Sequence, residues 1–283
     1  MFNGDAAICC RTKKNMNIDR ITYFSHYKKL LFYALNRFEG KNYQLMREYF
    51  ADILILELEE FIPIRNKKVL DVGGAQGQFC KVLSEKRQCD AINLDPEPGR
   101  YLWPKPKNIE EHIWPKTKVA FADSMPFSDN EFDLGICRGV LEHIPTEKQQ
   151  QSVNEMYRVT KPGGIFYIVI PPWYNPHAGH VLKPFHILPF NYAKYLRQLV
   201  FGNKINASSL QDMEIYPITY RRMLKLISES GFDVLSTKDT HFRLHFLTKI
   251  PVIREIAVPA IAFIVKKNFT CDQFAVDCKK KRQ

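Results

Sequence analysis

The segment 69–77 reads V-L-D-V-G-G-A-Q-G and combines an apolar run, one acid and three glycines. Glycine lets the backbone turn tightly and lets a ligand approach the main chain closely. A helix that follows such a turn offers unpaired N–H groups at its first residues. Because ligands of open α/β sheets sit beyond the carboxyl ends of the strands, the pattern predicts a ligand cradle at the end of a buried strand.

Two common nucleotide patterns are excluded at this cradle. A dinucleotide fingerprint counted from Gly73 requires glycine where the chain has Ala75 and Gln78. A phosphate loop requires Gly-Lys followed by Ser or Thr, which the segment lacks. Asp71, just before the glycines, would repel a phosphate but suits a cationic amino-acid group.

Two further acids follow apolar runs downstream. Asp95 ends the run 91–95, and Asp123 ends the run 119–123. A carboxylate can accept hydrogen bonds from two neighbouring hydroxyls, so a ligand contact is physically reasonable for Asp95, whereas Asp123 alone is a weak signal. The alternative for each is a turn-forming aspartate, and Pro96 directly after Asp95 is compatible with it.

These motifs, in this order, resemble the class I S-adenosylmethionine-dependent methyltransferases. Asp71, Gly73 and Gly77 match the family's D-x-G-x-G-x-G, with Ala75 at the middle glycine, and the resemblance continues over residues 66–170. Within it, 122–134 looks like the family's third-strand motif, 138–145 resembles its L-E-H element, and 158–164 resembles its K-P-G-G turn. The resemblance, which is to the type 11 small-molecule kind, implies S-adenosyl-L-methionine as cofactor, bound by Asp71, Gly73, Gly74, Gly77, Asp95, Asp123, Ser124, Met125 and Arg138.

The resemblance implies methyl transfer by in-line displacement. The sulfonium already activates the methyl group, so the protein mainly has to orient the reactants. His143 is the candidate general base and Arg138 a second candidate catalytic residue. The alternative is that Glu142 and His143 only orient their loop and help to start the next helix.

The segment 171–216 is a long connection rich in Pro, His and aromatic residues, and long connections are often lids or binding loops. It predicts a substrate-lining insert, and loop packing or a partner surface are the alternatives. No carboxylate or cysteine beside its histidines completes a metal-ligand set, so no metal is expected. The candidate substrate residues are Trp173, Tyr174, His177, His180 and His186.

Short apolar strands separated by helices indicate a parallel sheet covered on both faces. We expect strands at 68–72, 91–95, 119–123, 132–137, 164–170, 232–239 and 260–265. The helices expected between them are 76–87, 146–159 with Thr146 as N-cap, 192–200 and 217–230, which Gly231 stops. The fold class is α/β, a Rossmann-like class I methyltransferase fold whose seven-stranded, mostly parallel sheet has a reversed last strand.

The predicted domains are a loose leader (1–16), an N-terminal helical cap (17–64), the methyltransferase domain (65–267, insert 171–216) and a basic tail (268–283). We expect the cap and the insert to cover the cofactor mouth. The helices of the cap are expected at 21–38 and 41–61. The segment 241–254 mixes basic and apolar residues, and it either contacts an anionic membrane or packs on the core.

The amino-acid composition indicates a cellular compartment but does not identify the methyl acceptor. Seven cysteines without a C-x-x-C pair indicate a reducing compartment, and the lack of a long apolar run adds to the expectation of a cytoplasmic protein. The net charge of +11 would suit nucleic acid, an anionic membrane or an acidic small molecule, and the alternative is that it marks no specific partner. A small-molecule or lipid-like acceptor methylated on oxygen or carbon is our first prediction. An RNA methyltransferase and a non-catalytic binding protein with this fold are the alternatives.

Overall fold

The computed structural model describes residues 23–36, 40–100, 108, 110–202 and 204–269, and the chain divides into two compact units, 1–47 and 48–283. The smaller unit holds α1 (Tyr23–Asn36) and the first residues of α2 (Gly40–Glu59). The predicted leader 1–16 and residues 270–283 of the predicted tail lie outside the described residues. The position of the helical cap over the cofactor mouth stays a prediction.

The larger unit is built on one seven-stranded sheet with the order β3-β2-β1-β4-β5-β7-β6. β1 to β5 run parallel, whereas β7 is antiparallel to both of its neighbours, β5 and β6. This confirms the α/β fold class and the reversed last strand. The strands are β1 (Lys68–Val72), β2 (Asp90–Leu94), β3 (Thr117–Lys118), β4 (Phe132–Arg138), β5 (Thr160–Ile170), β6 (Asp233–Asp239) and β7 (Ile261–Lys266).

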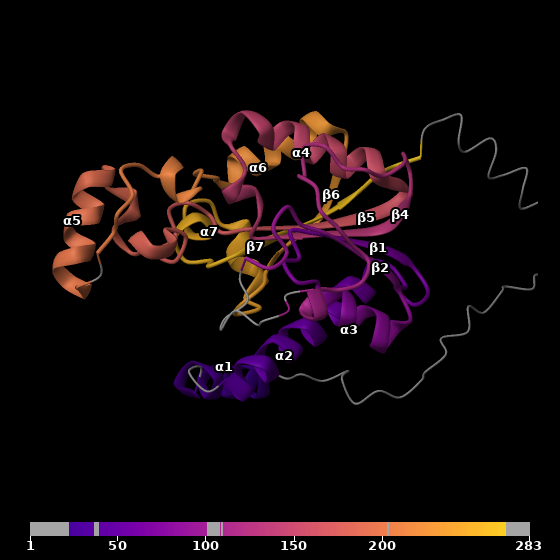
Figure 1. Ribbon diagram of the computed structural model, residues 1–283, viewed down its shortest axis with the longest axis horizontal. Coiled ribbons are helices and arrows are strands. Elements are labelled where there is room, and N and C mark those ends of the chain that lie inside the picture. The colour runs from indigo at the N-terminus through magenta and orange to yellow at the C-terminus, as the bar shows by residue number, and fades with distance from the viewer. Residues whose placement is uncertain (1–22, 37–39, 101–107, 109, 203, 270–283) are drawn as a thin grey trace, which may run out of the picture. The chain divides into compact units, whose positions relative to one another are not determined.

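Helices cover both faces of the sheet. In Figure 1, α4 (Thr146–Val159) and α6 (Tyr220–Ser230) lie on one face, and α3 (Gln78–Arg87) lies on the other. The insert carries α5 (Phe190–Phe201), and the four-residue α7 (Ile253–Ile256) precedes β7. Short 3-10 turns occupy 110–112, 141–143, 180–182, 185–187, 211–213 and 245–249.

The two apolar layers follow from the alternation of side chains along β5. Phe166, Ile168 and Ile170 join the cluster under α4 and α6, whereas Ile165, Tyr167 and Val169 join the cluster under α2 and α3. Successive side chains of a strand point to opposite faces. A strand buried on both faces therefore reads as a continuous apolar run in the sequence.

One predicted strand and one predicted cap are wrong. The strand expected at 119–123 is only β3, Thr117–Lys118, because its partner β2 ends at Leu94 and Pro96 cannot donate to a ladder. Val119 and Phe121 are therefore exposed. Thr146 is the first residue of α4, and Pro145 occupies the N-cap. The stop at Gly231 is confirmed, with φ +91°.

Gly135 allows β4 and β5 to pack closely. It pairs with Phe166 in the strand register, and a Cβ atom at Gly135 would lie 2.0 Å from a carbon of the Phe166 ring. Real Cβ contacts do not occur at that distance. The glycine therefore leaves the space that the aromatic ring fills.

Glu57 of α2 is a buried acid within the larger unit. Its Oε2 accepts a hydrogen bond from the Tyr167 hydroxyl at 2.9 Å, and its Oε1 has no partner among the described residues. Burial raises the pKa of Glu57 to about 7, and the bond from Tyr167 lowers it only in part. The charged form is therefore disfavoured in the folded protein.

We expect Glu57→Gln to remove a pH dependence of stability. With a folded pKa above the unfolded value, Glu57 destabilises the folded state progressively as pH rises from about 4.5 to about 7, and above that the penalty is constant. At pH 8 the variant should gain roughly 2–3 kcal/mol of unfolding free energy, whereas at pH 4.5 it should gain little. Urea unfolding of both proteins at the two pH values measures this. An equal difference in unfolding free energy between variant and wild type at both pH values would contradict this prediction. Glu85→Gln, at an exposed position, is the control and should show no such pH dependence.

Within the described part of the chain, no helix is both long and apolar enough to cross a membrane.

Candidate active site

A cavity of about 350 Å³ opens at the carboxyl ends of β1, β2 and β4. Four predicted residues from different parts of the sequence line this cavity. They are Gly73 after β1, Asp95 after β2, Asp123 in the loop after β3 and His143 beyond β4. The sheet topology brings them together because parallel strands end at the same edge. The rest of the lining comprises Val72, Leu94, Pro96, Glu97, Arg100, Ala120, Phe121, Ala122, Gly139, Val140, Ile144, Pro145, Lys148, Glu214 and Tyr216.

The glycine-rich loop turns through three left-handed residues. Gly73, Ala75 and Gly77 have φ values of +70°, +50° and +76°. Ala75 thus adopts, at the middle position of the motif, a conformation that favours glycine. Two hydrogen bonds hold it there, because its N–H donates to Asp95 Oδ2 at 2.9 Å and its carbonyl accepts from Asn93 Nδ2 at 2.8 Å.

We expect Ala75→Gly to be tolerated or slightly stabilising. Glycine removes the steric penalty of the left-handed conformation, about 1 kcal/mol, and the greater freedom of the unfolded chain offsets part of it. Thermal unfolding should therefore shift by no more than a few degrees, and the affinity for the cofactor should stay the same or rise. A large loss of stability would show that the alanine methyl group has a packing role.

Asp95 is the acid most closely integrated into the loop. It is buried, its Oδ2 accepts from Ala75 N, and its Oδ1 accepts from Glu97 N at 2.8 Å. The carboxylate therefore links the glycine-rich loop to the loop after β2, and Asp95 also lines the cavity. Asp123 is less confined, and its Oδ2 lies 2.9 Å from the exposed Lys148 Nζ.

The other predicted cofactor residues lie around the cavity rather than among the residues that line it. Asp71 is buried, and a Cβ atom at Gly74 would lie 2.4 Å from Asp71 Oδ2, so this glycine is needed for the close approach. A Cβ atom at Gly77 would lie 2.4 Å from Trp114 Cβ. Ser124 is exposed, whereas the Met125 side chain is buried in the core cluster under α4.

Arg138 ends β4 and is exposed, with its guanidinium 4.9 Å from the centre of the Phe79 ring. It is absent from the described residues that line the cavity. Its predicted roles in cofactor binding and catalysis stay predictions.

His143 is positioned by the segment that follows the insert's helix. Its Nδ1 lies 2.8 Å from the carbonyl oxygen of Glu214, and the backbone N–H of Tyr216 donates to the carbonyl of Glu142 at 2.8 Å. Because a carbonyl only accepts, Nδ1 carries the proton and Nε2 keeps its lone pair. This tautomer is the one that a general base needs.

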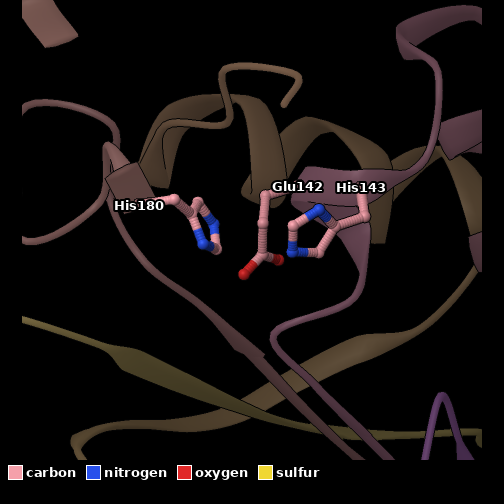
Figure 2. A group of neighbouring side chains, drawn as sticks. All are labelled: Glu142, His143 and His180. Atoms are coloured by element: carbon pink, nitrogen blue, oxygen red, sulfur yellow. The ribbon is translucent and has the colours of Figure 1, made fainter. Parts of the chain in front are cut away.

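Glu142, His143 and His180 form a cluster beside the cavity, and Figure 2 shows the Glu142 carboxylate near both imidazole rings, whose centres are 4.8 Å apart. One ligand atom from each of the three lies within 4.8 Å of the other two. Burial raises the pKa of Glu142 to about 7. Burial also lowers the pKa of His180 to about 4, helped by the neighbouring His143 and Lys183. His180 is therefore neutral near pH 7.

The remaining residues of the insert divide between packing and exposure. His186 is buried, its Nε2 lies 2.8 Å from the carbonyl of Trp173, and the two rings pack edge to face at 4.8 Å. His177 and Tyr174 are exposed. Of the three insert histidines, the structure thus brings only His180 into contact with His143.

Sequence reasoning missed several residues of the site. Glu142 supplies the carboxylate that the insert lacks, but it comes from another segment, so spacing within the insert could not reveal it. Phe121, Lys148 and Tyr216 line the cavity as well. Their residue types are ordinary, and only the fold places them there.

Comparison with known proteins agrees with the motifs. Residues 70–168 match the model of a methyltransferase domain. An uncharacterized methyltransferase of Mycobacteroides abscessus is 26% identical over 210 residues, which cover 73% of this chain and 79% of that protein. An uncharacterized methyltransferase of Mycobacterium tuberculosis is 28% identical over 207 residues, covering 72% and 78%.

Solved structures share the fold at low identity. One chain of the complex between the Haloferax volcanii Trm112 methyltransferase activator and a methyltransferase aligns with a TM-score of 0.51 and 14% identity, covering 82% of this chain and 95% of that one. A geranyl diphosphate C-methyltransferase of Streptomyces coelicolor aligns with a TM-score of 0.50 and 11% identity, covering 77% of each chain. The matched segment contains the glycine-rich loop, most of β1 and the strands β2, β3 and β4, so this part of the chain is similar to a class I S-adenosylmethionine-dependent methyltransferase domain.

Proposed function

We propose that the chain binds S-adenosyl-L-methionine in the cavity at the carboxyl ends of β1, β2 and β4. The methyl group passes to an oxygen or carbon atom of a small-molecule or lipid-like acceptor. The observation that carries the proposal is the convergence of Gly73, Asp95 and Asp123 on one cavity from three separate segments. Asp95 is assigned to the ribose hydroxyls and Asp123 to the adenine amino group.

The exposed surface of the insert supports a lipid-like acceptor. Tyr192, Tyr195 and Leu199 of α5 are each more than 60% exposed. Lys194 and Arg197 of the same helix are half-buried and donate to the carbonyls of Ala207 and Lys183. The exposed apolar side chains therefore carry the argument, since they suit contact with a membrane surface. The segment 241–254 adds the exposed Phe246 and Val252.

The proposal includes a cytoplasmic location. Its support is the chemistry of Cys80, Cys89 and Cys137, which are free, buried thiols. Free thiols persist in a reducing compartment.

Calorimetric titration with S-adenosyl-L-methionine tests the cofactor site. We expect one cofactor per chain, with an affinity that the product S-adenosylhomocysteine matches or exceeds. If no heat of binding is measured at millimolar cofactor, the proposal is wrong. The chain would then have a methyltransferase fold that binds a different ligand. Cofactor binding without any methylated product in the assay below would favour the non-catalytic alternative.

A methyl-labelled cofactor identifies the acceptor class. The protein is incubated with a lipid extract, a polar metabolite extract or an RNA fraction, and the label is counted in each. We expect label in the lipid or metabolite fraction. Label in RNA, with activity that falls steeply as salt rises, would replace the proposal by the RNA alternative.

Sedimentation with anionic vesicles tests the membrane contact. The double variant Tyr195→Ser and Leu199→Ser should lose most of its vesicle binding. The control is Val234→Ser with Leu235→Ser, which removes two exposed apolar side chains from β6. Equal binding by the α5 variant and the wild type would exclude α5 as the contact surface.

A further inference from the structure

The cluster of Glu142, His143 and His180 unites two segments that are far apart in the sequence. Glu142 and His143 lie in the 3-10 turn 141–143, and His180 opens the 3-10 turn 180–182 in the insert. Figure 2 shows the three side chains pointing toward a common space. Within the described part of the chain, this is the group of His, Cys, Asp and Glu side chains whose ligand atoms lie close enough to share a metal ion.

Two buried polar atoms of the cluster lack a hydrogen-bond partner among the described residues, which indicates that the cluster binds a ligand. Glu142 Oε2 and His180 Nε2 are both buried, and neither has a hydrogen-bond partner among the described residues. A buried polar atom without a partner costs about 1–3 kcal/mol. The third side chain, His143, has its Nδ1 fixed by the Glu214 carbonyl, so the lone pair of Nε2 is available. A carbonyl that orients a ligating imidazole in this way is the usual support of a histidine metal ligand.

We propose that Glu142, His143 and His180 form a binding site for one Zn²⁺ ion at the edge of the cofactor cavity. An ion at the centre of three atoms 4.8 Å apart lies about 2.8 Å from each. An inward movement of each ligand atom by roughly 0.7 Å gives bonds of about 2.1 Å, the length that zinc adopts with nitrogen and oxygen. Side-chain rotations of that size leave the backbone in place.

The ligand types decide between ions. Two imidazoles and one carboxylate suit zinc, whereas Mg²⁺ and Ca²⁺ prefer oxygen ligands alone. Three protein ligands leave the fourth tetrahedral position open, as in catalytic rather than structural zinc sites. His143 lines the cofactor cavity, which places the cluster at the edge of that cavity. This step rests on the proposed function: a hydroxyl group of the acceptor would take the open position, and the ion would lower its pKa so that its proton passes to solvent. With zinc bound, His143 would be a ligand through Nε2 and would not act as the general base.

Equilibrium dialysis against Zn²⁺, without cofactor or acceptor, tests the site. After treatment with a chelator, the wild type should bind one zinc ion per chain with submicromolar affinity. Glu142→Gln and His180→Ala should each bind it about 100-fold more weakly or worse, because losing a ligand costs more than losing a supporting hydrogen bond. His177→Ala removes an exposed histidine of the same insert and should bind like the wild type.

Three outcomes overturn the proposal. The first is a wild-type protein that binds no zinc at micromolar concentration. The second is zinc that remains on Glu142→Gln and on His180→Ala, which would show that it binds outside this cluster. The third is equal loss in His177→Ala. Circular dichroism checks that each variant is folded, and His180→Gln replaces His180→Ala if the latter is not. Because the cofactor titration is a separate measurement, a failed zinc site leaves the proposed function standing.

Discussion

Asp95→Asn should weaken the binding of S-adenosyl-L-methionine by roughly 100-fold. The carboxylate accepts hydrogen bonds from Ala75 N and Glu97 N and is assigned to the ribose hydroxyls as well. An amide can accept through only one of its two terminal atoms, so one loop contact and at least one ribose contact are lost. Hydrogen bonds to a charged group contribute about 1.5–3 kcal/mol each, and two at the lower value correspond to this fold-change.

Calorimetry on Asp95→Asn measures the effect, and Asp90→Asn is its matched control. Asp90 is the first residue of β2 and therefore lies at the amino end of the strand that Asp95 follows. There it forms an exposed ion pair of 2.7 Å with Lys116. Asp90→Asn should leave the affinity for the cofactor unchanged. Unchanged affinity in Asp95→Asn would instead show that Asp95 serves only to shape its turn.

Gly135→Ala should destabilise the fold by about 3 kcal/mol or more. The added methyl group would lie 2.0 Å from the Phe166 ring, and both residues are central in the sheet. Forcing extra volume into a packed core costs typically 1–3 kcal/mol, and a rigid aromatic ring held between two strands places this site at the upper end. Urea unfolding of the purified variant measures the loss.

A double variant separates this clash from a general effect of removing glycine. Phe166→Leu shortens the ring side chain, so Gly135→Ala should cost at least 1 kcal/mol less in its presence. The comparison is Gly202→Ala, at a residue with no described atom within 4 Å of its added Cβ but with φ +72°. That variant should lose only about 1 kcal/mol. Strictly additive losses for Gly135 and Phe166 would show that the ring is not the obstacle.

The sheet could be predicted from the sequence because its strands are short apolar runs between helices. β1 was predicted at its observed bounds, and β2, β4, β6 and β7 within one residue at each end. The site acids could be predicted for the same reason, since Asp95 ends a strand and the ends of parallel strands converge.

What failed depends on neighbours that are distant in the sequence. β3 is short because β2 ends beside it, and a window around 119–123 contains no sign of that. The carboxylate at Glu142 could not be assigned to the insert histidines, because their contact exists only after the insert folds back onto the turn 141–143.

The shortness of β3 also affects the self-association of the protein. β3 is one of the two outer strands of the sheet, and an outer strand can pair with another chain through its unpaired N–H and C=O groups. Two residues, Thr117 and Lys118, offer too few such groups to hold a foreign strand in register. Pro115 shortly before them has no N–H to offer. The early end of β3 therefore disfavours pairing with another chain at this edge, and the seven-residue β6 forms the other edge of the sheet.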